Sequence, residues 1–162
     1  MKITELKLRR IIREELDSGD DPVDRMMDLD PWTFDQDETL GWRSLPADKQ
    51  IKALKSYIEG PAPGMKKKRL DGKHIDKNTI TWHLGQALAM EGKVEEAISW
   101  MNQSLADDDP QWNRYIKATI AFLEDDRTAF EEHASGDNYN SDVLDRLRAG
   151  WDGSYSAAYS GD

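Results

Sequence analysis

Apolar side chains recur every three to four positions along most of the chain after residue 44. This spacing places them together on one face of an α-helix. The pattern predicts helices over about 46–59, 79–91, 93–106, 110–124, 127–134 and 141–151. No segment alternates apolar and polar residues over a stretch long enough to predict a strand. The sequence therefore predicts an all-α fold built from antiparallel helical hairpins.

Residues that start or stop helices stand at these predicted boundaries. Pro46 suits a first helical turn, and the run Gly60-Pro61-Ala62-Pro63-Gly64 ends that helix. Gly92 stands where a left-handed C-cap is expected, and Asp109-Pro110 supplies an N-cap and a first-turn proline. The residues expected to face inward are Ala47, Ile51, Leu54, Ile58, Ile80, Leu84, Ala87, Leu88, Val94, Ala97, Ile98, Met101, Leu105, Trp112, Tyr115, Ile116, Thr119, Leu123, Val143, Leu144, Leu147 and Trp151.

The first 43 residues have a different character. Within residues 1–16 the pattern predicts an amphipathic helix, whose single apolar stripe is formed by Leu8, Ile11, Ile12 and Leu16. Residues 17–43 are predicted to form an acidic, irregular arm that is anchored by its large aromatic side chains. Within it, Val23 to Leu29 could form a short helix. The domain of helical hairpins is expected over 44–151, followed by a polar tail over 152–162.

The net charge of −10 is distributed in blocks. Residues 44–78 carry nine bases and four acids, whereas residues 79–162 carry sixteen acids and six bases. An acidic surface repels phosphate, so the composition disfavours nucleic acid as a partner. The exception is a basic loop over 65–77, where Lys66, Lys67, Lys68 and Arg69 are candidate anion-binding residues. The favoured alternative is that this loop is solvated or pairs with the acidic arm, because no aromatic residues are interleaved with its cations.

Catalytic and metal-binding patterns are missing from the sequence. There is no cysteine, and the three histidines have no spacing typical of zinc ligands. No calcium loop, phosphate-binding glycine loop or nucleophile motif occurs. We therefore expect no metal, no cofactor and no enzymatic activity. A small helical-bundle enzyme or small-molecule regulator, with His83 beside a carboxylate, remains an alternative.

The sequence also contains no apolar run of the roughly 20 residues that cross a bilayer. The N-terminal residues lack a secretory apolar core. A cytoplasmic protein without a membrane association is therefore expected.

Residues 78–135 resemble tetratricopeptide repeats, which are pairs of antiparallel helices with a period of 34 residues. Leu84-Gly85 matches the pair in the first helix, Ala97 matches the small residue of the second helix, and Glu91-Gly92-Lys93 matches the turn. The second unit, over about 112–135, is degenerate because its second helix is short. The resemblance implies a surface that binds a protein partner.

The N-terminus resembles the start of uncharacterised proteins of large tailed phages, many of them marine. The residues that carry this resemblance are Met1-Lys2-Ile3-Thr4 and the segment from Leu8 to Leu16. In that group some virion proteins lose an N-terminal peptide by cleavage after an Ile-x-Glu or Leu-x-Glu sequence. Ile12-Arg13-Glu14 matches this pattern. The resemblance implies a virion or assembly component, located in the host cytoplasm or the virion.

Taken together, these features favour a non-catalytic module for protein–protein interaction, assembly or self-association. The candidate partner-binding residues are Leu8, Ile11, Ile12, Leu16, Trp100 and Trp112. Tryptophans are included because they often anchor protein interfaces. A nucleic-acid accessory protein that acts through the basic loop 65–77 is a further alternative.

Overall fold

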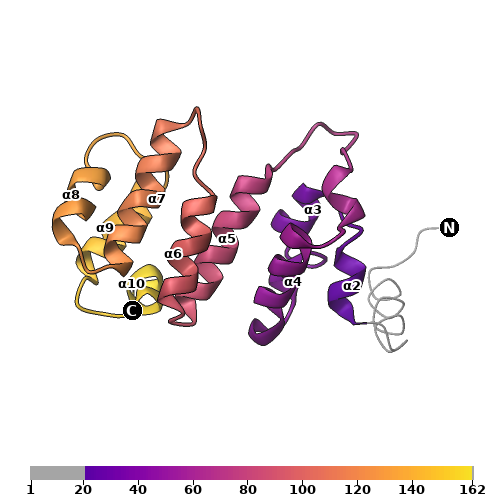
Figure 1. Ribbon diagram of the computed structural model, residues 1–162, viewed down its shortest axis with the longest axis horizontal. Helices are drawn as coiled ribbons and strands as arrows, with labels where there is room; N and C mark the ends of the chain where they lie inside the picture. Colours follow the sequence, from indigo (N-terminus) through magenta and orange to yellow (C-terminus); the bar gives the residue numbers. More distant parts are fainter. Residues whose placement is uncertain (1–20, 162) are drawn as a thin grey trace. The chain divides into compact units, whose positions relative to one another are not determined.

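The computed structural model describes residues 21–161. Over these residues the chain forms nine α-helices and two short 3₁₀ helices, and it contains no strand (Figure 1). The all-α prediction is therefore confirmed. The chain divides into two compact units, one ending at His74 and the other beginning at Ile75. The division falls after residue 74 and not at residue 44, where the sequence analysis placed the start of the helical domain.

The first unit is built around one long helix. Its elements are α2 (Pro22–Met26), α3 (Pro31–Gln36), the 3₁₀ helix η1 (Trp42–Ser44), α4 (Ala47–Glu59) and the 3₁₀ helix η2 (Pro63–Lys66). Of the two short helices in the acidic arm, α2 overlaps the short helix expected over 23–29, whereas α3 lies in the part that was expected to be irregular. Each begins with an Asp-Pro pair, in which Asp21 caps Val23 N and Asp30 caps Thr33 N, both at 3.1 Å. Proline in the first turn loses no helical hydrogen bond there.

Aromatic side chains attach the described part of the predicted acidic arm, residues 21–43, to α4. Phe34 stacks on Tyr57 with ring centroids 3.8 Å apart and planes within 6° of parallel. The Tyr57 hydroxyl donates to the carbonyl of Leu29 at 2.6 Å. The buried Trp42 donates its indole N–H to the buried carboxylate of Asp35 at 3.1 Å. Because α4 buries its apolar face against these residues, it belongs with them and not with the later helices.

The second unit contains three pairs of consecutive helices, with α5 and α6, α7 and α8, and α9 and α10 packing against each other (Figure 1). Their bounds are α5 (Lys77–Met90), α6 (Val94–Gln103), α7 (Pro110–Leu123), α8 (Arg127–Ala134), α9 (Ser141–Ala149) and α10 (Tyr155–Ser160). The first five agree with the predicted helices to within a few residues at each end. The sixth, α10, lies in the segment that was expected to be a polar tail. It forms because Ser154 caps Ala157 N and because Tyr155 is buried.

Glycine and alanine let α5 and α6 approach closely. A Cβ added at Gly85 would lie 2.6 Å from Cγ of Met101 and 3.2 Å from the carbonyl oxygen of Ala97. Gly92 connects the two helices with φ of +72°, as expected of a left-handed C-cap. Eight of the residues predicted to face inward in this region are buried: Ile80, Leu84, Leu88, Ala97, Met101, Tyr115, Ile116 and Thr119. Six others are half-buried: Ala87, Val94, Ile98, Leu105, Trp112 and Leu123. The prediction that Ala47 faces inward is wrong, because this residue is exposed in the first turn of α4.

Candidate partner-binding site

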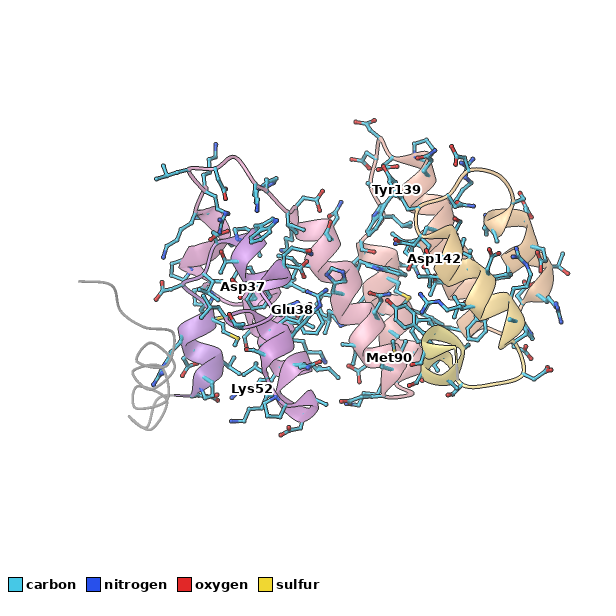
Figure 2. All side chains as sticks on the ribbon, turned by 180° about the vertical axis from the view of Figure 1, so that it is seen from behind. Asp37, Glu38, Lys52, Met90, Tyr139 and Asp142 are labelled. Atoms are coloured by element: carbon cyan, nitrogen blue, oxygen red, sulfur yellow. The ribbon has the colours of Figure 1, made fainter. Side chains whose placement is uncertain are left out.

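A pocket of about 320 Å³ opens at one end of the second unit. Its lining comes from the start of α5, the loop and first turn of α7, and the turn before α9. The lining residues are Asp76, Asn78, Thr79, Ala106, Asp109, Trp112, Tyr139 and Asn140. We call it the N-cap pocket, because Asp76, Asp109 and Asn140 are the N-cap residues of α5, α7 and α9. Figure 2 shows Tyr139 near the end of the unit opposite Met90.

Two carboxylates of the N-cap pocket are held by local hydrogen bonds. Oδ1 of Asp76 accepts from both the backbone N–H and the hydroxyl of Thr79 at 2.9 Å. Oδ1 of Asp109 accepts from the backbone N–H of Trp112 at 2.9 Å. Each aspartate therefore caps the N-terminus of a helix and places a formal negative charge beside the pocket.

The aromatic wall of the pocket continues into the core. Trp112 meets Tyr139 edge to face with centroids 6.3 Å apart, and it meets the buried Trp82 at 5.8 Å. Tyr115 lies 5.0 Å from Trp82. Burial raises the pKa of the Tyr115 hydroxyl, while a hydrogen bond with the Asn140 side chain acts in the opposite direction. The outermost ring is Tyr139, which is 45% exposed.

The loop between α6 and α7 is fixed by side chains of α7. The Trp112 indole N–H donates to the carbonyl of Ser104 at 3.0 Å. Asn113 bonds both backbone groups of Ala106, accepting from its N–H at 2.9 Å and donating to its carbonyl at 2.6 Å. This side of the N-cap pocket is therefore preorganised. The opposite side is a turn in which Gly136 and Asn140 both have positive φ values.

A second, larger pocket of about 490 Å³ lies in the same unit, at the end that carries Met90 (Figure 2). Apolar and aromatic side chains such as Phe122 and Trp151 contribute to its lining. The Trp151 indole N–H donates to Asp125 at 2.9 Å, and its ring packs on Phe122 and Phe130. Trp151 is thus engaged by its own unit, whereas Tyr139 offers an exposed ring.

The structure brings one predicted partner-binding residue to the N-cap pocket. Trp112 lines it, but Trp100 is half-buried on α6 and lines neither pocket. The predicted stripe of Leu8, Ile11, Ile12 and Leu16 lies outside the described residues. Sequence reasoning missed Tyr139 and the carboxylates of Asp76 and Asp109. The aspartates could be recognised locally as helix caps, but their meeting at one pocket depends on the tertiary fold.

The predicted anion-binding residues are partly occupied by internal partners. Lys67 donates to the backbone carbonyl of Asp28 at 2.6 Å. Arg69 forms two hydrogen bonds with the carboxylate of Asp71, at 2.9 and 2.6 Å, and it also bonds the Thr33 hydroxyl at 2.8 Å. The guanidinium lies 4.7 Å from the Trp32 ring centre. Lys67 and Arg69 thus contact residues of the acidic segment, Asp28 and Thr33, and Arg69 also pairs with Asp71. Lys66 and Lys68 are exposed.

Neither of these two pockets is lined by a histidine. Among residues 21–161 no group of three or more histidine or carboxylate side chains could hold a metal ion. Within the same range, every helix is too short or too polar to cross a membrane. Comparisons with protein-family models, with curated proteins and with solved structures each gave no match.

Proposed function

We propose that the second unit is a docking module for a protein partner and that the N-cap pocket is its binding surface. The observation that carries this proposal is the aromatic pair Trp112 and Tyr139 beside a pocket with a preorganised wall. Rigid aromatic side chains are the commonest anchors of protein interfaces. A wall that is already ordered lowers the entropic cost of binding.

A tetratricopeptide-like character of α5 and α6 would suit this role. The close contact at Gly85 and the left-handed turn at Gly92 are the features that support it. Assembly of a phage particle is the biological setting that the N-terminal sequence suggests. In that setting the stripe including Ile11 and Ile12 forms a second contact, which Ile11→Asp and Ile12→Asp would disrupt.

The first test compares two exposed side chains of similar accessibility. Tyr139 is 45% exposed in the pocket, and Leu40 is 43% exposed in the other unit. The full-length protein is applied to an array of immobilised peptides with random sequences, and bound peptides are then titrated in solution. Tyr139→Ala should weaken binding about tenfold, because removing an interface anchor costs more than ~1 kcal/mol. Leu40→Ala should change it less than twofold.

The result that contradicts the proposal is equal binding by wild type and Tyr139→Ala. Circular dichroism of both variants must match the wild-type spectrum, so that a lost interaction is not a lost fold. The nucleic-acid alternative is weakened by the internal pairing of Lys67 and Arg69.

A further inference from the structure

We propose that the N-cap pocket receives a lysine or arginine side chain of the partner. This inference rests on the docking function proposed above and adds the chemistry of the group that is recognised. It is argued from the carboxylates, the aromatic rings and the distribution of charge.

The first step concerns the carboxylates of Asp76 and Asp109. The hydrogen bonds that cap α5 and α7 use Oδ1 of each residue. No partner for either Oδ2 is found among the described residues. The pocket lining also contains no lysine, arginine or histidine. Two formal negative charges therefore border one cavity without a cation of the lining to neutralise them.

The helix dipoles reduce this charge but do not reverse it. Each of the three helices that begin at the pocket contributes about half a positive charge at its N-terminus. Together they oppose the two full negative charges of Asp76 and Asp109, and about half a negative charge remains. The nearby bases are Lys77, which follows Asp76, and Arg114, which donates to the carbonyl of Asp137 in the turn. The nearby acids outnumber them, because Asp107, Asp108 and Asp137 are all exposed near lining residues. A cation is favoured over an anion in this place.

The second step concerns the aromatic rings. Elsewhere this chain places its own cations over exposed or half-buried rings, as with Lys73 over Trp32 at 4.4 Å and Arg146 over Tyr159 at 5.2 Å. No such internal cation is found over Trp112 or Tyr139 among the described side chains. A cation near an aromatic face is stabilised by the quadrupole of the ring. A cation from another chain could therefore contact both the aromatic rings and the carboxylates of the pocket.

The third step concerns the charge of the whole unit. Residues 75–162 contain seventeen acids and seven bases, which gives −10. Residues 21–74 contain ten of each, and residues 1–20 contain five of each. The entire net charge of the protein is therefore carried by the unit that contains the pocket. Such a field increases the association rate of a basic partner and disfavours an acidic one.

The test uses peptides that differ only in one group. Peptides selected on the array are resynthesised with lysine, norleucine, arginine, citrulline or glutamate at the anchoring position. Norleucine and citrulline keep most of the side-chain shape and remove the charge. Affinity for the full-length protein is measured by titration, and contact with the pocket is followed through the indole N–H resonance of Trp112. The lysine and arginine peptides should bind about tenfold more tightly than their neutral counterparts.

The matched protein variants are Asp76→Asn and Asp109→Asn. Asparagine caps a helix as well as aspartate does, so these variants remove charge and preserve the cap. The double variant should lose the preference for lysine over norleucine, whereas Asp152→Asn, which borders the other pocket, should keep it. Raising the salt concentration from about 0.05 to about 0.5 M should reduce the preference for lysine severalfold, because salt screens the attraction between exposed charges.

The outcomes separate the two proposals. A preference for cations that disappears in the double variant supports both. Equal binding of lysine, norleucine and glutamate peptides, still sensitive to Tyr139→Ala, overturns the cation inference and leaves the docking function intact. Cation preference that persists in the double variant also overturns the assignment to Asp76 and Asp109. If no peptide shifts the Trp112 resonance, both proposals are wrong.

Discussion

Replacing Gly64 with alanine should selectively destabilise the first unit. A Cβ at this position would lie 2.6 Å from the carbonyl carbon of Leu29 and 2.7 Å from that of Asp28. The carbonyl oxygen of Leu29 would lie closer still, and ordinary contacts begin at 3.4 Å, so one backbone segment must move by more than about 0.8 Å. Backbone atoms cannot escape by rotating, unlike the end of a flexible side chain.

The displaced carbonyl of Leu29 makes the energetic cost calculable. It accepts the hydroxyl of the buried Tyr57, and Gly64 N donates to the carbonyl of Met27 at 2.9 Å. Losing these two hydrogen bonds costs about 1 kcal/mol each. Overpacking adds about 1–3 kcal/mol. The free energy of unfolding of this unit should therefore fall by about 3–5 kcal/mol, which corresponds to a loss of amide protection in α4 of roughly a hundredfold or more.

Hydrogen exchange with mass spectrometry measures this loss separately in α4 and in α7. Gly72→Ala is the control for the loss of a glycine, because nothing lies within 4 Å of its added Cβ and only its φ of +75° is unfavourable. Tyr57→Phe should cost about 1 kcal/mol in the wild type but almost nothing in Gly64→Ala, where the hydroxyl has already lost its acceptor. Protection of α4 within threefold of wild type, or an equal cost of Tyr57→Phe in both backgrounds, would refute this reasoning.

Three further changes test the caps, the ion pair and the helix crossing. Asp109→Ala should lower the free energy of unfolding by about 1 kcal/mol and Asp109→Asn by a few tenths, as measured by urea unfolding; equal losses would contradict the capping role. The Arg69 guanidinium lowers the pKa of Asp71 from 3.8 to about 2, so the stabilisation from this pair is complete above pH 4 and is lost as pH falls toward 2. An NMR titration should find the Asp71 midpoint near 2 in the wild type and nearer its ordinary value in Arg69→Gln, where only the Lys73 backbone hydrogen bond and charge still lower the pKa; an unchanged midpoint would contradict the role of Arg69. Gly85→Val should force Met101 aside and cost about 2 kcal/mol, seen as a lower melting temperature; an unchanged melting temperature would show that α5 and α6 can separate freely.

The long helices were predictable because their signals are local. The pair Asp109-Pro110 starts α7, and Gly92 ends the α5 segment, without help from distant residues. The same Asp-Pro signal occurs at Asp21-Pro22 and Asp30-Pro31, where α2 and α3 begin. A short helix was expected only near the first of these pairs, because the acidic composition of the remaining segment indicated a linker. Helices of five or six residues show no apolar period, so their caps were the only readable evidence.

The N-cap pocket was not predictable in the same way. Asp76 and Asp109 are explained completely by capping when each is considered in its own segment. Their shared position depends on how α5 and α7 pack, and periodicity gives no information about this. Tyr139 lies between the predicted helices 127–134 and 141–151, in a short polar segment that contains Gly136. A large aromatic side chain in such a segment was the one signal in the sequence that Tyr139 is exposed. Trp112 was assigned both to the core and to a partner surface, and its half-buried ring occupies a position between the two.

Hydrogen bonds hold the backbone on both sides of the N-cap pocket, and this determines which group loses freedom when a partner binds. Trp112 and Asn113 fix the loop before α7 through three hydrogen bonds to its backbone. The turn before α9 is tied to α7 and α8, because Arg114 donates to the carbonyl of Asp137 at 2.6 Å and Asn138 donates to the carbonyl of His133 at 3.2 Å. It also contains Asn140, whose φ of +51° is a conformation that asparagine tolerates better than most residues. Since hydrogen bonds hold the backbone on both sides of the pocket, the entropic cost of binding falls mainly on the exposed side chain of Tyr139. A cation that enters beside the rings would therefore order this side chain between walls that already have their bound shape.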